Sequence, residues 1–187
     1  QMSTASLDRT SDGPRNMAGV DLMDGRVFVV WATSGGEVYG RVYSGDDHDW
    51  ASAAVTIADP ALAMDVDGAQ QQQAALASGY PLDIIRTDSG RLIVAVLGAA
   101  PGPSTDLVLH YSDDDGATWR SASLAAYDEP LPFGTGQSYD CIAMGYHEGR
   151  VLLLVGSEIS GQETNVRGWY QYASASDGMD YTRVEET

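Results

Sequence analysis

Short apolar runs alternate with turns rich in Gly, Asp and Arg along most of the chain. The runs are too short and too rich in β-branched residues to favour helices, so they predict β-strands. After residue 17 one plan appears three times: an apolar strand, a turn ending in Gly-Arg, a fully apolar strand, a variable loop, a Tyr-rich strand, an acidic turn, and an aromatic residue entering a last strand. The Gly-Arg pairs lie 65 residues apart (90 minus 25) and then 59 (149 minus 90).

This repeat predicts an all-β chain, specifically a β-propeller segment of about three four-stranded antiparallel blades. The aromatic residues that follow the acidic turns, Trp50, Trp119 and Tyr181, are expected to pack between neighbouring blades. The expected parts are an N-terminal arm at 1–17, blade 1 at 18–58, an inter-blade loop at 59–79, blade 2 at 80–126, an inter-blade loop at 127–138 and blade 3 at 139–187.

Three blades do not close a ring, because the end blades would expose apolar sheet. The expected partners are therefore other propeller blades, further copies of this chain, or a larger assembly. We also expect the 187 residues to be a piece of a longer or processed protein. Within the loop at 59–79, residues 69–77 are good helix formers, and a short surface helix and a flexible linker are both open there.

The stretch from Ser112 to Trp119 predicts a tight, self-capped turn. Ser and Asp side chains bond nearby backbone N–H groups, and Gly116 tolerates a positive φ. A calcium loop is disfavoured, because the alternating ligand ladder and its closing Glu are absent. As Ser-x-Asp-x-Gly-x-Thr-Trp, the stretch resembles the Asp-box of sialidase-like β-propellers and BNR repeats. The resemblance implies a structural motif made of five residues: Ser112, Asp114, Gly116, Thr118 and Trp119.

The resemblance implies architecture but not hydrolysis. Sialidases carry an Arg-Ile-Pro motif and grip their substrate with three arginines, whereas the corresponding stretch here, residues 80–85, has no Arg. Arg26, Arg91 and Arg150 belong to tight turns on the opposite face, where we expect them to pair with Asp. We accordingly assign no catalytic residue and lean against an enzyme.

Binding is expected on the face that carries the long connections, because loops on a rigid scaffold carry function. Asp21, Asp83 and Asp140 are expected to open the first strand of each blade and to converge on a cation or a cationic ligand group. The alternative is that each is a solvated or turn-bonding residue. Tyr80 and Tyr139 are candidates for stacking on sugar rings, with core packing as the alternative.

The charge balance limits the classes of partner that the chain can bind. The chain has 27 acidic residues, 10 arginines and no lysine, giving a net charge of −17. Such a surface repels nucleic acid and anionic membranes, and no apolar run is long enough to span a bilayer. His48, His110 and His147 lack metal-ligand spacing, so we expect neither a metal nor a cofactor. Cys141 is expected to be a buried thiol.

The sequence favours a non-catalytic propeller module that recognises glycan or protein, and takes part in assembly, outside the cell or on a virion surface. Two alternatives stay open. One is a divergent sialidase-like glycoside hydrolase or lyase whose site is incomplete in this chain, and the other is a purely structural acidic surface protein.

Overall fold

The computed structural model describes residues 16–33, 37–58, 82–99, 105–123, 137–159, 166–174, 178 and 181–183. Within these residues every regular element is a β-strand. The prediction of an all-β chain is therefore confirmed, while residues 69–77, where a short helix was one expectation, lie outside the described part.

The strands form three open antiparallel sheets in chain order. The first sheet contains β1 to β5, at Asn16–Asp21, Arg26–Ala32, Val38–Ser44, Asp49–Trp50 and Val55–Ala58. The second sheet contains β6 to β9, at Leu82–Arg86, Leu92–Ala99, Thr105–Ser112 and Arg120–Ser123. The third sheet contains β10 to β13, at Gln137–His147, Arg150–Ile159, Val166–Ser174 and Tyr181–Arg183.

Consecutive strands are neighbours in every sheet, and the one departure is the outer edge of the first sheet. There β4 and β5 both pair with β3, so the expected fourth strand is split in two. Ser52 lies at the break, where its Oγ accepts a hydrogen bond from the Val42 amide at 3.1 Å and its carbonyl accepts one from Arg41 Nε at 2.6 Å. These bonds replace the ladder hydrogen bonds that the break removes.

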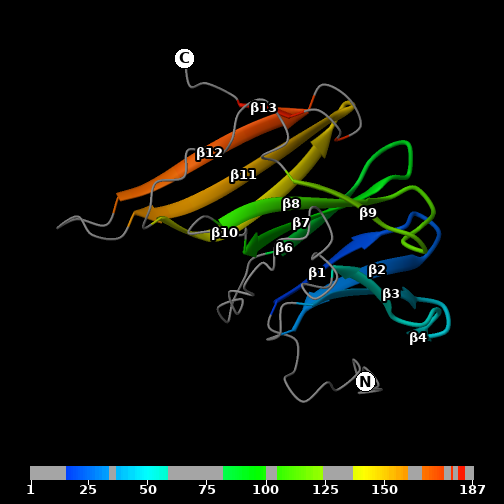
Figure 1. Cartoon of the computed structure of the whole chain (residues 1–187). Helices are drawn as coiled ribbons and strands as arrows, with labels where there is room; N and C mark the ends of the chain where they lie inside the picture. The colour runs from blue at the N-terminus through cyan, green and yellow to red at the C-terminus, as the bar shows by residue number, and fades with distance from the viewer. Residues whose placement is uncertain are drawn as a thin grey trace.

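The sheets are stacked in chain order, with the second sheet between the first and the third (Figure 1). The first strands of the sheets lie together, because β6 contacts both β1 and β10. One apolar core fills the space between the first and second sheets, with Trp119 packed against it. Its buried members are Leu22, Phe28, Val30, Ala32, Val38, Val42, Ile57, Leu82, Ile84, Leu92, Val94 and Val96.

The second strand of each sheet contains a run of at least five apolar residues, but the three runs are buried differently. In β7 the residues from Leu92 to Ala95 are all 0% exposed, because a sheet lies on either side. In β11 Val151 and Leu153 are 0% exposed, whereas Leu152 between them is 41% exposed. Among the described residues, an apolar second strand is therefore covered on both faces in the middle sheet and on only one face in the third.

Tight turns join the first and second strands of each sheet, as the Gly-Arg pairs predict. Gly25, Gly90 and Gly149 all have a positive φ, of 82°, 91° and 76°, a region that favours glycine. The first two turns are closed alike, since the amide of Leu22 donates to the Arg26 carbonyl and that of Thr87 to the Arg91 carbonyl, each at 2.9 Å. The following arginines are thereby placed at the same end of the stack.

Candidate functional site

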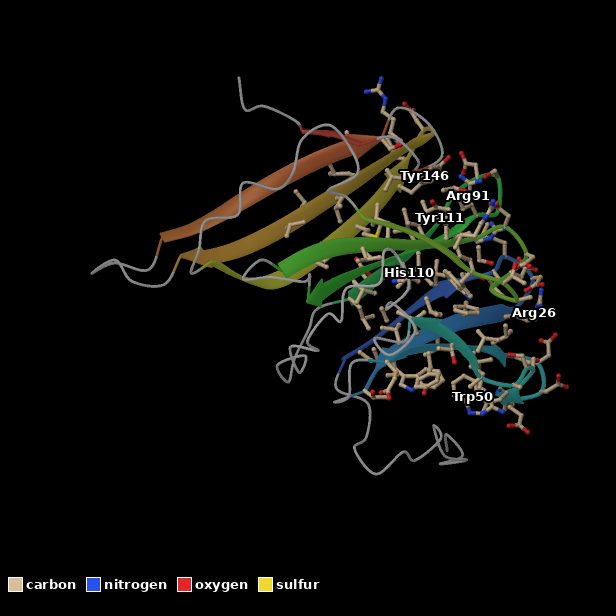
Figure 2. All side chains as sticks on the ribbon, in the orientation of Figure 1. Arg26, Trp50, Arg91, His110, Tyr111 and Tyr146 are labelled. Atoms are coloured by element: carbon tan, nitrogen blue, oxygen red, sulfur yellow. The ribbon has the colours of Figure 1, made fainter. Side chains whose placement is uncertain are left out.

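The turns and connections between strands lie on two opposite sides of the stacked sheets, and these two sides differ in character. One side carries the tight turns and the acidic turn, which we define as Ser112 to Trp119; Arg26 and Arg91 mark it in Figure 2. The other side carries the long connections, most of which lie outside the described residues, Tyr80 among them. The described part of the predicted binding face therefore consists of the strand ends that lead into these connections.

Asp83 lies on this side, at the second position of β6, opposite Ala95. Its Oδ2 accepts a hydrogen bond from the Met144 amide of β10 at 2.7 Å, and its Oδ1 accepts one from the Ile84 amide at 2.8 Å. The half-buried carboxylate thus links the first strands of two sheets. Because both oxygens are engaged with backbone, Asp83 acts as a structural bridge in this structure.

The three aspartates do not occupy matching positions, so the expectation that each opens a first strand is wrong for Asp21. Asp21 is the last residue of β1 and faces Val27 across the ladder, next to the tight turn. Its Oδ1 accepts a hydrogen bond from the Met23 amide at 2.6 Å. Asp21 is opposite Val27, which lies two residues after Gly25. The corresponding residue in the second sheet is Arg86, which is opposite Leu92, two residues after Gly90. Asp21 is therefore a turn-bonding residue at the other end of the stack.

Asp140 and Tyr139 both lie near the beginning of β10, on the side of the long connections. Tyr139 pairs with Ser157, and the register shifts between Tyr139 and Cys141, which leaves Asp140 unpaired in the ladder. A β-bulge of this kind redirects side chains and often accompanies binding sites. Ligand binding by these two residues stays a prediction.

The acidic turn is capped by its own side chains, as the sequence predicts. Ser112 Oγ accepts the Gly116 amide at 2.9 Å, and Asp114 accepts both the Thr118 amide, at 2.8 Å, and the Thr118 hydroxyl, at 2.6 Å. Trp119 Nε1 donates to the Gly116 carbonyl at 2.9 Å. The bonds from Thr118, together with one from Ser112, lower the pKa of Asp114 from 3.8 to about 2 because they favour the ionised form.

The acidic turn also joins the second sheet to the first. The Trp119 ring lies 5.6 Å from the Phe28 ring, centroid to centroid, so the expected packing of this aromatic residue between sheets is confirmed. Gly116 has φ 87°, and a Cβ at this position would overlap the Phe28 ring. Arg26 reaches across from the first sheet to Asp115 at 3.2 Å.

Arginine and aspartate side chains form a charged network at this end, as expected for Arg26 and Arg91. Asp113 accepts from Arg91 Nε at 2.6 Å and contacts Arg120 at 2.8 Å. The hydrogen bond from Arg91 is the main reason that the pKa of Asp113 lies below its usual value. These pairs are largely exposed, so they position the turns more than they stabilise the fold.

Sequence reasoning gave no role to two further side chains. His110 on β8 is 6% exposed, and burial lowers its pKa from 6.5 to about 4, which keeps the imidazole neutral at pH 7 (Figure 2). Arg86, at the turn end of β6, has a buried Nε with no hydrogen-bond partner among the described residues, and its guanidinium packs over Gly90. Neither residue carries a sequence signal, because both environments depend on contacts made after folding.

Within the described residues, no three His, Cys, Asp or Glu side chains are grouped so as to hold a metal ion. The same part of the chain contains no helix with the length and apolar character of a membrane span.

Comparison with known proteins shows a likeness of fold without a likeness of sequence. No protein-family model and no curated protein matches the chain. Among solved structures, a mutant α-L-arabinofuranosidase, arb93a from Fusarium graminearum in complex with an iminosugar inhibitor, superposes with a TM-score of 0.62 at 12% identity. A mutant of AofleA from Arthrobotrys oligospora gives 0.54 at 12%, and the exo-β-1,3-galactanase 1,3Gal43A from Clostridium thermocellum gives 0.50 at 12%.

The matches cover nearly all of this chain but less than half of each matched protein. They extend over 90%, 92% and 92% of this chain, and over 47%, 42% and 34% of the matched chains. The likeness therefore supports a shared all-β fold, and this chain spans less than half the length of each matched chain.

Proposed function

We propose that this chain is a segment of a β-propeller that serves as a non-catalytic recognition module, binding a glycan or a protein outside the cell or on a virion surface. Three antiparallel sheets stacked in chain order, with β1, β6 and β10 brought together, support the propeller arrangement. Propellers place their first strands around a common axis and carry ligands where long connections meet that axis.

A carbohydrate ligand is supported by the fold likeness to an α-L-arabinofuranosidase and an exo-β-1,3-galactanase. At 12% identity this likeness does not transfer an activity, since one fold hosts many functions. Tyr139 and Asp140 lie on the side of the long connections, where a ring-stacking aromatic residue and a carboxylate acceptor would suit a sugar.

The proposal that the module is non-catalytic is supported by the hydrogen bonds that the Asp83 carboxylate accepts. Asp83 lies near the beginning of β6, the first strand of the middle sheet, which contacts both β1 and β10. A general acid, a base or a nucleophile needs an oxygen free to reach the substrate. Both oxygens of Asp83 instead accept backbone N–H groups, one of them from the neighbouring sheet.

A glycan array probed with the 187-residue chain tests binding, and fluorogenic α-L-arabinofuranosides, β-galactosides and sialosides test turnover. We expect binding without turnover. Tyr139→Ala should weaken binding about fivefold or more if the ring stacks on a sugar, because truncating an aromatic anchor at a binding surface costs about 1 kcal/mol or more. Asp88→Asn is the matched control, since Asp88 is exposed in the turn at the opposite end.

A divergent glycoside hydrolase is the second candidate, favoured by the activities named for two of the similar structures. Turnover that Asp140→Asn abolishes while Asp88→Asn leaves it unchanged would establish the enzyme and refute the proposal. Absence of glycan binding, together with a stable stoichiometric protein complex, would instead support a structural role.

A further inference from the structure

The two end sheets each leave an apolar face without a neighbouring sheet among the described residues. On the first sheet this face holds Val27, Val29, Tyr43 and Trp50, all half-buried, and we call it the outer aromatic face. On the third sheet it holds Ala143, Leu152 and Leu154, and we call it the outer leucine face. Cross-strand register places the members of each set on one side of their sheet.

The outer aromatic face matches a surface that is already buried elsewhere in the chain. Counted from the positive-φ glycine of each turn, Val27 and Val29 correspond to Leu92 and Val94 of the second sheet. Leu92 and Val94 are 0% exposed because they pack against the first sheet. On its side away from the second sheet, the first sheet thus carries the residues that correspond to those the second sheet buries.

Trp50 extends this correspondence to the acidic turns. Trp50 follows the turn at residues 44–49 of the first sheet, as Trp119 ends the acidic turn of the second sheet. Trp119, however, packs on Phe28 of the preceding sheet. Trp50 lies edge-on to Tyr43 of its own sheet, at 5.6 Å, with the Arg41 guanidinium 4.9 Å from its ring centroid. Figure 2 shows Trp50 on the side of the first sheet that points away from the second sheet.

The outer leucine face matches the other half of the same interface. Leu152 lies three residues after Gly149, as Phe28 lies three residues after Gly25. Phe28 is 1% exposed under Trp119, whereas Leu152 is 41% exposed. The first and third sheets of one chain therefore carry, on their outer faces, both halves of the contact that the first and second sheets make with each other.

We propose that two copies of this chain associate head to tail, the outer aromatic face of each copy packing on the outer leucine face of the other. In this contact Trp50 covers Leu152 as Trp119 covers Phe28. Two such contacts related by a twofold axis close a ring of six sheets. The lengths of two similar solved chains also suit a second copy. Each match covers 90% or 92% of this chain but only 47% or 42% of the solved chain, so two copies are about as long as one solved chain.

The charge of the chain gives this association a distinct salt dependence. Each copy carries a net charge of −17, so two copies repel each other at low ionic strength. The named members of both faces are apolar, although the charged residues Asp21, Arg41 and Arg150 lie on the same sides of their sheets. Salt screens the repulsion between the two copies without weakening apolar packing. Raising the NaCl concentration should therefore strengthen the dimer, the reverse of what an interface of ion pairs would show.

Analytical ultracentrifugation of the 187-residue chain over a range of protein and NaCl concentrations tests the proposal. We expect a species of twice 19.9 kDa whose dissociation constant falls as NaCl rises. Leu152→Arg should raise that constant at least about tenfold, because it places a charge in an apolar contact. Met23→Arg is the matched control, since Met23 is 76% exposed on the turn end and lies outside both faces.

Cysteine cross-linking tests the orientation independently of affinity. In a Cys141→Ser background, a Trp50→Cys chain mixed with a Leu152→Cys chain should form a disulfide-linked pair, while neither should link to itself. A monomer at every protein and salt concentration, an unchanged dissociation constant for Leu152→Arg, or self-linked Trp50→Cys pairs would each overturn the proposal. Circular dichroism of each variant confirms that it is folded.

Discussion

Replacing Gly116 with alanine measures how tightly the acidic turn of the second sheet fits the first sheet. The backbone at Gly116 has φ 87°, which costs an alanine about 1–2 kcal/mol. The new Cβ would also overlap the ring of Phe28, and such overpacking typically costs about 1–3 kcal/mol. Gly116→Ala should therefore reduce the free energy of unfolding by about 2–5 kcal/mol.

Gly149→Ala separates the two contributions. Gly149 has a similar φ of 76°, but a Cβ there would meet nothing within 4 Å, so only the backbone cost of about 1–2 kcal/mol applies. Urea unfolding followed by tryptophan fluorescence gives both values under one condition. The difference between the two variants is then the cost of the clash.

Phe28→Leu provides the second test of the same contact, because it removes the ring that the new Cβ would strike. In the Phe28→Leu background, Gly116→Ala should cost only about 1–2 kcal/mol, close to the value for Gly149→Ala. Equal losses for Gly116→Ala and Gly149→Ala, or an undiminished loss in the Phe28→Leu background, would refute the close packing of the turn on Phe28.

Three further predictions concern single side chains. The pKa of Asp114 is about 2 in the folded protein against 3.8 for an ordinary Asp, so its contribution to stability is present above pH 3.8 and is lost as the pH falls towards 2. The stability difference between wild type and Asp114→Asn should shrink over that window in acid unfolding experiments, and a constant difference would contradict the hydrogen bonds from Thr118. The pKa of His110 is lowered to about 4 from 6.5, so the unfolded chain takes up the proton first and stability falls as the pH drops from 6.5 to about 4. His110→Leu should flatten that part of the profile in thermal melts, and an NMR titration of His110 with a midpoint near 6.5 would show that the ring is not buried. Asp83→Ala leaves the Met144 amide without its acceptor and should cost about 1–3 kcal/mol in urea unfolding, with faster hydrogen exchange at Met144. Asp88→Ala, in an exposed turn, should change neither, and equal behaviour of the two variants would refute the bridge.

Local sequence signals predicted the turns well, because their geometry depends on neighbouring residues alone. The Gly-Arg pairs predicted positive-φ turns, and Gly25, Gly90 and Gly149 adopt them. The spacing of Ser112, Asp114 and Thr118 predicted side-chain capping, and each of the three takes part in it. Both predictions needed only the reach of a short side chain to its own backbone.

Positions that depend on strand register were predicted less well. Asp21, Asp83 and Asp140 each stand beside apolar residues, which suggested one common role. The register instead puts Asp21 at the end of β1 and Asp83 near the beginning of β6. Asp21 lies four residues before Gly25, whereas Asp83 lies seven residues before Gly90, so the distance from the turn separates them where apolar neighbours do not.

Contacts between sheets were beyond local reasoning in most cases. The packing of Trp119 on the preceding sheet was expected from the repeat, but the burial of His110 was not. His110 stands in a strand of alternating character and owes its low pKa to the sheet that covers it. Only the repeat, which brings one sheet against the next, could have suggested such burial.

The hydrogen bond between Asp83 and Met144 bears on how the sheets remain separate. β6 and β10 are edge strands that run close together, and two open edges of this kind can zip into one continuous ribbon. The Asp83 carboxylate accepts a hydrogen bond from the Met144 amide at the edge of β10. Pairing of the two edges would be unfavourable, because the charged carboxylate would lose this donor. The hydrogen bond between Asp83 and Met144 therefore holds the two sheets together while keeping β6 and β10 as separate edges.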